Sequence, residues 1–258
     1  MKRFIAFMFL LLAVYGCSPA NKCAAAETRE TCVHILFIGN SYTFVNDLPN
    51  MFAELAHAGG HKVETGMVAA GGLTLADHSK SPEVTNQLES STWDFVVLQE
   101  QSEIPAIQQY RTQEMYPAAR MLAHKIEQTG GIPILFVTWA HRKGLPQAGL
   151  PDYDSMQANI DDGYLGIARE LNVPIAPVGY AWSLVTKQNP QLDLWQGDGS
   201  HPNEQGTYLA ASVFYAVIFH QSPQGLTFRA DLSSDTAQFL QTIAADTVLN
   251  NPQSWNLP

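Results

Sequence analysis

The sequence predicts a single α/β domain in which a parallel sheet is covered by helices on both faces. From residue 33 onward, apolar runs of strand length alternate with segments of helical spacing. This alternation is typical of strand–helix–strand units with right-handed crossovers. The first run, residues 33–38, is apolar almost throughout, as expected for a parallel strand buried on both faces. No internal repeat or linker divides residues 33–258, so one three-layer domain is the simplest account.

The individual elements follow from periodicity and from the residues that end them. Leu48, Met51 and Leu55, for example, share one helical face, and the pattern stops at Gly59. Because ligands bind beyond the carboxyl ends of the strands in such sheets, the residues after each strand are candidate site residues. Strands are expected at residues 33–38, 62–68, 94–98, 134–138 and 173–178, and helices at residues 48–58, 115–128, 155–171, 207–220 and 236–249.

The N-terminus is typical of an exported lipoprotein. Two basic residues precede an apolar run over residues 4–14, which is shorter than the roughly 20 residues that a membrane-spanning helix needs. This pattern indicates a signal peptide over residues 1–16. The Val-Tyr-Gly-Cys stretch that ends at Cys17 resembles a lipobox, which predicts acylation of Cys17, with an ordinary signal peptide as the alternative. Residues 17–32 would then be a lipidated tether, and the domain would face the periplasm or the cell surface, held to a membrane by its lipid alone.

The chain is acidic and contains three cysteines. Its formal net charge is −10; without Lys2 and Arg3, 12 basic residues stand against 24 acidic ones, a net charge of −12. Such a surface, with no basic run, argues against a nucleic-acid partner. Besides Cys17, the chain has Cys23 and Cys32, which can form a disulfide in an oxidising compartment. Two free thiols are the alternative.

Polar residues follow the first three predicted strands and recur in one loop near the end of the chain. They lie in the stretches Gly-Asn-Ser-Tyr-Thr (39–43), Gly-Gly-Leu-Thr (71–74), Gln-Glu-Gln-Ser (99–102) and Gly-Asp-Gly-Ser-His-Pro-Asn (197–203). This ordered set resembles the SGNH (GDSL-like) hydrolase family, over about residues 33–220. The resemblance implies a flavodoxin-like fold with five parallel strands in the order 2-1-3-4-5. It also implies serine chemistry that needs no metal or organic cofactor.

The resemblance implies a catalytic triad. A serine hydroxyl is a poor nucleophile until a neighbouring base takes its proton, and imidazole suits that role because its pKa lies near neutrality. By resemblance, Ser41 is the nucleophile, His201 is the base, and Asp198 orients His201. The sequence departs from many members of the family at Asn40, where they have Asp; the Asn carbonyl oxygen can still accept a hydrogen bond.

The resemblance also implies an oxyanion hole with three donors. The first is the backbone N–H of Ser41, and the second is the N–H of Gly72, with Gly71 as the alternative. The third donor in the family is an asparagine side chain in a Gly-x-Asn-Asp block. Here Gln101 occupies that place, with Gln99 as the alternative.

Other polar and aromatic residues have ordinary interpretations as well as functional ones. His57 and His61 have helical spacing, but Gly59 and Gly60 interrupt the helix between them, so two surface histidines are expected in place of a metal pair. Four residues could belong either to the pocket or to ordinary packing: His141, Trp139, Trp195 and Glu100. For Glu100 a solvated or salt-bridged side chain is expected, and for Trp195 stacking on a sugar is the functional alternative.

Taken together, these features predict an exported ester hydrolase that removes a short acyl group. Acetyl is the leading candidate, and export and the family resemblance suggest a carbohydrate or envelope glycan as the alcohol portion. One alternative is an acyltransferase that uses the same acyl-enzyme, and another is a non-catalytic surface lipoprotein that binds glycan. A long-chain lipase is a weaker alternative because the sequence has no long apolar lid segment.

Overall fold

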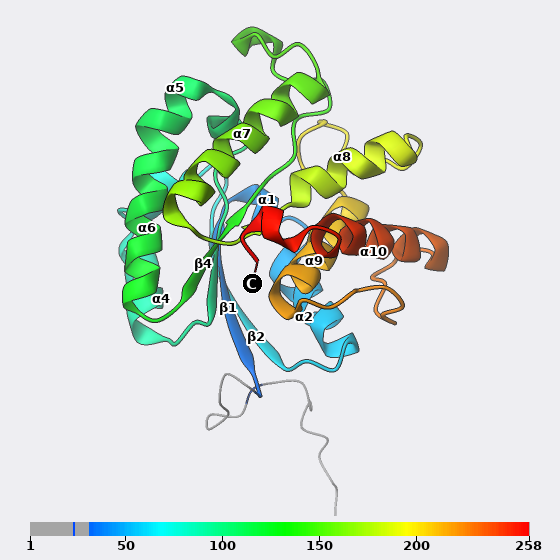
Figure 1. The fold of residues 1–258 in the computed structure, drawn as a ribbon, viewed down its shortest axis with the longest axis horizontal. Coiled ribbons are helices and arrows are strands. Elements are labelled where there is room, and N and C mark those ends of the chain that lie inside the picture. The colour runs from blue at the N-terminus through cyan, green and yellow to red at the C-terminus, as the bar shows by residue number, and fades with distance from the viewer. Residues whose placement is uncertain (1–22, 24–30, 258) are drawn as a thin grey trace, which may run out of the picture.

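A five-stranded parallel sheet lies between two layers of helices in the computed structural model, which describes Cys23 and residues 31–257 (Figure 1). The strand order is β2-β1-β3-β4-β5, which confirms the predicted three-layer α/β fold. The strands are β1 (Val33–Gly39), β2 (Val63–Ala69), β3 (Phe95–Leu98), β4 (Ile132–Phe136) and β5 (Ile175–Ala176).

The order of the strands places β1 between β2 and β3. β1 pairs with β2 on one side, where Gly39 lies opposite Ala69, and with β3 on the other, where Ile38 lies opposite Leu98. After β1 the chain adds β2 on one side of it, and then crosses over to add β3 on its other side. Such a switch point is where open α/β sheets bind ligands.

The helices divide between the two faces of the sheet. Figure 1 shows α4 and α6 on one side and α2, α9 and α10 on the other. α8 packs with α9 and α10, and α7 packs with α6. The helices are α1 (Ser41–Phe44), α2 (Leu48–Ala58), α3 (Leu75–His78), α4 (Pro82–Ser90), α5 (Gln108–Tyr110), α6 (Tyr116–Gln128), α7 (Tyr153–Leu171), α8 (Val178–Gln188), α9 (Glu204–Phe219) and α10 (Ser234–Leu249).

The core on one face of the sheet forms around α9. Phe214 of this helix contacts Phe37 of β1 and Phe136 of β4 edge to face, with ring centroids 5.3 and 5.0 Å apart. Every residue from Gly206 to Ile218 is buried, since α2 and α10 pack against the sides of α9 that the sheet leaves uncovered. A helix that is apolar on all sides is expected only in such a central position.

The structure differs from the sequence-based prediction mainly around β5. A strand was expected over residues 173–178, but β5 is limited to Ile175–Ala176. Pro174 and Pro177 flank it, and neither has a backbone N–H to donate to a sheet. α8 begins directly after Pro177, and the sequence pattern did not predict this helix.

Part of the N-terminal prediction lies outside the described residues. This applies to the signal peptide at 1–16, to the acylation of Cys17 and to most of the tether. Cys23 and Cys32 are described and form a disulfide, with their Cα atoms 5.7 Å apart. Within residues 31–257, no helix has both the length and the apolar composition that crossing a membrane would require.

Candidate active site

Ser41 lies in the sharp turn that connects β1 to α1. It is the first residue of α1, and Asn40 caps this helix, since its Oδ1 accepts a hydrogen bond from the N–H of Tyr42 at 3.2 Å. Gly39 precedes the cap because a Cβ at this position would collide with the side chains of Gln99 and Thr43. The Ser41 side chain therefore faces the end of the sheet from a tightly packed turn.

Three predicted residues from distant parts of the sequence form one chain of hydrogen bonds. Ser41 Oγ lies 2.9 Å from His201 Nε2, and His201 Nδ1 lies 2.6 Å from Asp198 Oδ2. Asp198 Oδ1 also accepts the backbone N–H groups of Ser200 and His201. Burial alone would raise the pKa of the Asp198 carboxyl, but these hydrogen bonds hold that pKa below its ordinary value. Asp198 therefore stays ionised beside the imidazole, as an orienting carboxylate must.

The loop that carries Asp198 and His201 is fixed from the β4–α7 connection. Trp139 Nε1 donates to the Ser200 carbonyl at 3.0 Å, and the Arg142 N–H donates to the Gly199 carbonyl at 2.8 Å. The Arg142 guanidinium also pairs with Asp193 at 2.7 Å. These contacts hold His201 in position without using the His201 ring itself.

A stack of aromatic rings also supports the position of His201. Tyr42 stacks on Trp139 with ring centroids 4.5 Å apart, and Trp139 stacks on Trp182 at 4.1 Å. Tyr42 contacts the His201 ring edge to face, and its hydroxyl bonds Ser200 Oγ at 2.8 Å. Burial raises the pKa of Tyr42, so the phenol remains neutral and its hydrogen bond persists at neutral pH.

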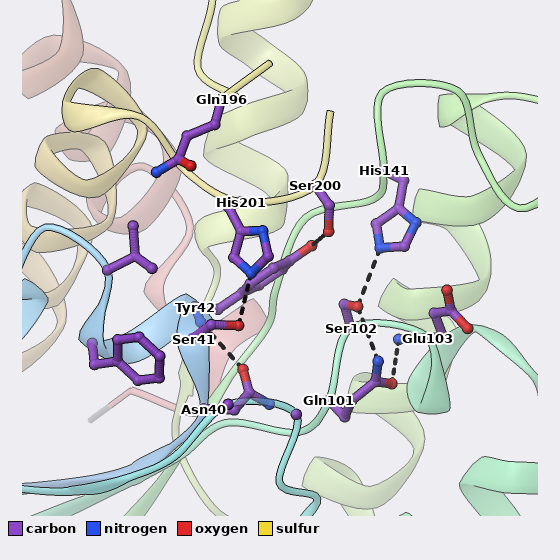
Figure 2. Close-up of a pocket in the computed structure, with 14 residues that line it drawn as sticks. Asn40, Ser41, Tyr42, Gln101, Ser102, Glu103, His141, Gln196, Ser200 and His201 are labelled. Carbon is purple, nitrogen blue, oxygen red and sulfur yellow. Dashed lines mark hydrogen bonds between the residues drawn. The ribbon is translucent and has the colours of Figure 1, made fainter. Parts of the chain in front are cut away.

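Ser41 and His201 open into a pocket of about 620 Å³ at the carboxyl edge of the sheet (Figure 2). The lining comes from the segments that follow the strands and from the loop that carries His201. Besides Ser41 and His201, it comprises Asn40, Tyr42, Phe44, Val45, Gly71, Gly72, Gln101, Ser102, Glu103, His141, Gln196 and Ser200.

Solved structures resemble this chain in fold. A candidate SGNH hydrolase from Slackia heliotrinireducens is 28% identical, with a TM-score of 0.63 over 72% of this chain and 99% of that one. The chain therefore resembles an SGNH-type hydrolase. Two further structures share the fold. A DUF4886 family protein from Bacteroides uniformis is 18% identical (TM-score 0.73; 84% and 95% covered), and an acetylxylan esterase from Geobacillus stearothermophilus is 17% identical (TM-score 0.55; 70% and 92% covered).

SGNH-type hydrolases and esterases are thus among the solved structures that share this fold, which supports an ester hydrolase of this fold. No protein-family model matches the chain, and no curated protein does.

Gln99 and Gln101, the two alternatives for the third oxyanion donor, have different environments. Gln99 is fully buried, and its Nε2 donates to Asn40 Oδ1 and to the Glu100 carbonyl. Both hydrogens of that amide are therefore used. Gln101 lines the pocket, and its Oε1 accepts the N–H groups of Glu103 and Ile104. This orients its Nε2 away from that turn, toward Ser102 Oγ at 3.3 Å. Gln101 therefore keeps a second amide hydrogen at the pocket, whereas Gln99 does not.

The predicted glycine donor lies in a tight turn after β2. The Leu73 N–H bonds the Ala70 carbonyl at 3.3 Å, and Gly72 has a φ of +73°, a conformation that favours glycine. Asn40 Nδ2 donates to the Leu73 carbonyl at 2.9 Å, which ties this turn to the Ser41 loop. Both Gly71 and Gly72 line the pocket. Among the described residues, no hydrogen bond engages the N–H of Ser41 or Gly72.

Several secondary candidates turn out to be packing residues. Trp139 is fully buried beneath Tyr42, and Trp195, 7% exposed, donates to the Ala140 carbonyl and contacts Tyr153 and Trp182. His61 stacks on Phe219 at 3.8 Å, away from the pocket. His141, in contrast, lines the pocket.

Several residues that line the pocket have no local signal in the sequence, because the direction of a side chain into a pocket depends on the tertiary fold. These residues are Phe44, Val45, Glu103 and Gln196. Ser200 could have been singled out, since it lies between Asp198 and His201 in the same short loop.

One group of side chains has the spacing of a metal site among the described residues: Cys23, Cys32 and His34. The two cysteines form a disulfide, and disulfide sulfurs are not thiolate ligands. This group lies at the start of β1, at the opposite end of the sheet from Ser41.

Glu100 was expected to be solvated or salt-bridged, and this prediction is wrong. Its carboxyl is fully buried. Oε1 accepts the N–H groups of Leu75 and Gln101 at 3.1 and 2.7 Å, whereas Oε2 has no hydrogen-bond partner. Glu100 therefore links the segments after β2 and β3 that carry Gly72 and Gln101. Burial raises the pKa of this carboxyl to about 7, although both hydrogen bonds oppose the shift.

We predict that Glu100→Gln stabilises the protein relative to the wild type as the pH rises. The Glu100 pKa is higher in the folded chain than in the unfolded chain, where it has its ordinary value of 4.5. The unfolded state therefore releases its proton first, and wild-type stability falls between pH 4.5 and about 7. The difference should reach about 3 kcal/mol at pH 8. Urea unfolding of both proteins at pH 4.5, 6 and 8 measures it; a difference that does not vary with pH would contradict the shifted pKa.

Proposed function

We propose that the chain is a serine esterase that removes a short acyl group, with acetyl as the leading candidate, from a carbohydrate or envelope glycan. The observation that carries this proposal is the hydrogen-bonded chain from Ser41 through His201 to Asp198, which opens into a pocket. Nucleophile, base and orienting carboxylate are all within hydrogen-bond reach, which is the geometry that nucleophilic catalysis requires.

The reaction begins with attack of Ser41 Oγ on the ester carbonyl carbon. His201 Nε2 takes the Ser41 proton as the new C–O bond forms, while the Asp198 carboxylate stabilises the imidazolium through Nδ1–H. The proton then passes from His201 to the leaving alcohol, and an acyl-enzyme on Ser41 remains. Water, activated by His201, attacks this ester and releases the acid and free Ser41.

Three donors are available for the oxyanion of each tetrahedral intermediate. These are the N–H groups of Ser41 and Gly72, which no described residue engages, and the Nε2 of Gln101. Glutamine has the same amide as the family's asparagine on a side chain longer by one methylene. The Oε1 contacts of Gln101 with Glu103 and Ile104 compensate for that length, since they fix the orientation of the amide before substrate binds.

Two lines of support bear on the substrate. The wall at the end of α1 is apolar, with Phe44 and Val45, and the remaining lining contains several hydroxyl and amide groups and the Glu103 carboxylate. An acetylxylan esterase shares the fold, although at 17% identity. A small apolar acyl group and a polar alcohol portion fit this division.

The proposed location is outside the cytoplasm, with the domain held to a membrane by a lipid on Cys17. The support is the basic and apolar pattern of residues 1–17 together with the Cys23–Cys32 disulfide, which persists in an oxidising compartment. Esters of envelope glycans would be accessible from there.

Hydrolysis of p-nitrophenyl acetate, butyrate and octanoate by the full chain tests the proposed function. We expect the shortest ester to be cleaved fastest. Ser41→Ala and His201→Ala should each lower kcat by roughly 10⁴-fold or more, because either loss removes the activated nucleophile. His124→Ala, at an exposed histidine on α6, is the matched control and should retain full activity. Equal rates for wild type, Ser41→Ala and His201→Ala would contradict the proposal.

The role of Gln101 has a sharper test in Gln101→Glu. The carboxylate keeps an oxygen that can accept from Glu103 and Ile104 but loses the Nε2 donor. Removal of one oxyanion donor is expected to lower kcat by about 10²–10³-fold, with a melting temperature close to that of the wild type. If kcat is unchanged, Gln101 is not a donor to the oxyanion.

A further inference from the structure

The pocket has two chemically different sides around Ser41. Phe44 and Val45 follow the nucleophile after β1, and they supply the apolar side. Ser102 and Glu103 follow β3, and His141 follows β4. Figure 2 shows these three side chains together, across the pocket from Gln196, with Ser41 and His201 between. An ester bound at Ser41 has an acyl portion and an alcohol portion. The apolar side of the pocket suits an apolar acyl group, and the polar side suits a polar alcohol portion.

A directed set of hydrogen bonds fixes Ser102 and His141. Gln101 Nε2 can only donate, so Ser102 Oγ accepts at 3.3 Å. The same oxygen lies 3.1 Å from His141 Nε2. Burial lowers the pKa of His141, although the nearby Glu103 carboxylate opposes the shift. A neutral ring and a hydroxyl that can both donate and accept therefore stand beside each other on this side of the pocket.

Glu103 adds a carboxylate whose hydrogen-bonding capacity is not used by the protein. Within the described part of the chain, no hydrogen bond or ion pair engages its side-chain oxygens. No lysine or arginine is among the pocket-lining residues. A carboxylate without a cation repels anionic groups and accepts hydrogen bonds from hydroxyls. A neutral group with several hydroxyls can form hydrogen bonds with Ser102 and Glu103 at the same time.

We propose that Ser102, Glu103 and His141 form a subsite for the alcohol portion of the ester, which binds a neutral polyhydroxy group through a free hydroxyl near the acylated oxygen. This inference rests on the proposed esterase function and deepens it. His141 acts through Ser102 as a positioning residue, whereas Ser102 and Glu103 contact the substrate hydroxyl.

A pair of esters that differ in one hydroxyl tests the subsite. Cyclohexyl acetate and the monoacetate of trans-1,2-cyclohexanediol have the same ring and acyl group, and only the second has a neighbouring hydroxyl. The quantity of interest is the ratio of kcat/KM for the hydroxylated ester to that for the plain ester, measured with the full chain. A charge-assisted hydrogen bond predicts a wild-type ratio of about 10 or more.

Variants identify the residues that produce this ratio. Glu103→Gln and His141→Leu should each lower the ratio about 10-fold, mainly through a higher KM for the hydroxylated ester. His141→Gln, which keeps a polar partner for Ser102, should recover part of it. His124→Leu, at an exposed histidine outside the pocket, should leave the ratio at its wild-type value.

Two results would overturn the subsite while leaving the esterase intact. One is a wild-type ratio near 1. The other is a parallel loss on both esters in Glu103→Gln and His141→Leu, which would indicate a purely structural role. Failure of the proposed function looks different: the wild type would then cleave neither these esters nor p-nitrophenyl acetate faster than Ser41→Ala does.

Discussion

Reciprocal hydrogen bonds between Asn40, through its backbone and side chain, and the Gln99 side chain fix the end of β1 against the end of β3. The Asn40 N–H donates to Gln99 Oε1 at 2.8 Å, and Gln99 Nε2 donates to Asn40 Oδ1 at 2.9 Å. Both side chains are buried, so leaving either without its hydrogen-bond partner would destabilise the folded protein. Asn40 also caps α1 and binds the Leu73 carbonyl. One amide pair thus sets the positions of Ser41 and of the turn that contains Gly72.

Packing, and not sequence proximity, brings His201 to Ser41. Ser41 and His201 are 160 residues apart, and a β-bridge between Trp195 and Pro202 closes the loop that carries His201. Trp139 supports this loop further, since it donates to the Ser200 carbonyl and stacks between Tyr42 and Trp182. Tyr42, which follows Ser41 in the chain, is thereby part of the support for His201. A site assembled in this way costs little reorganisation when substrate binds.

Much of the fold could be predicted from the sequence, because strands buried on both faces and helices ended by glycine leave strong patterns. α4 was missed although Ser81 and Pro82 are a good helix start, since Val84 and Leu88 alone give too little periodicity. Ser41, Asp198 and His201 stood out through motif order. Glu100 was misassigned because only the tertiary fold brings its partners near: the Leu75 N–H bonds its carboxyl, and the Tyr164 hydroxyl accepts its backbone N–H. Ser102 follows β3 and His141 follows β4, so the sequence gives no signal of their contact.

We propose Ser41 as the activated nucleophile, and stoichiometric labelling of the protein by a fluorophosphonate would test this role. Ser102 offers an internal comparison, since it is a second serine in the same pocket with its own histidine partner. Intact mass and peptide mapping of the full chain should show one phosphonyl group, located on Ser41, and Ser41→Ala should remain unlabelled. Labelling of Ser102, or no labelling of the wild type, would contradict the assignment of Ser41 as the nucleophile.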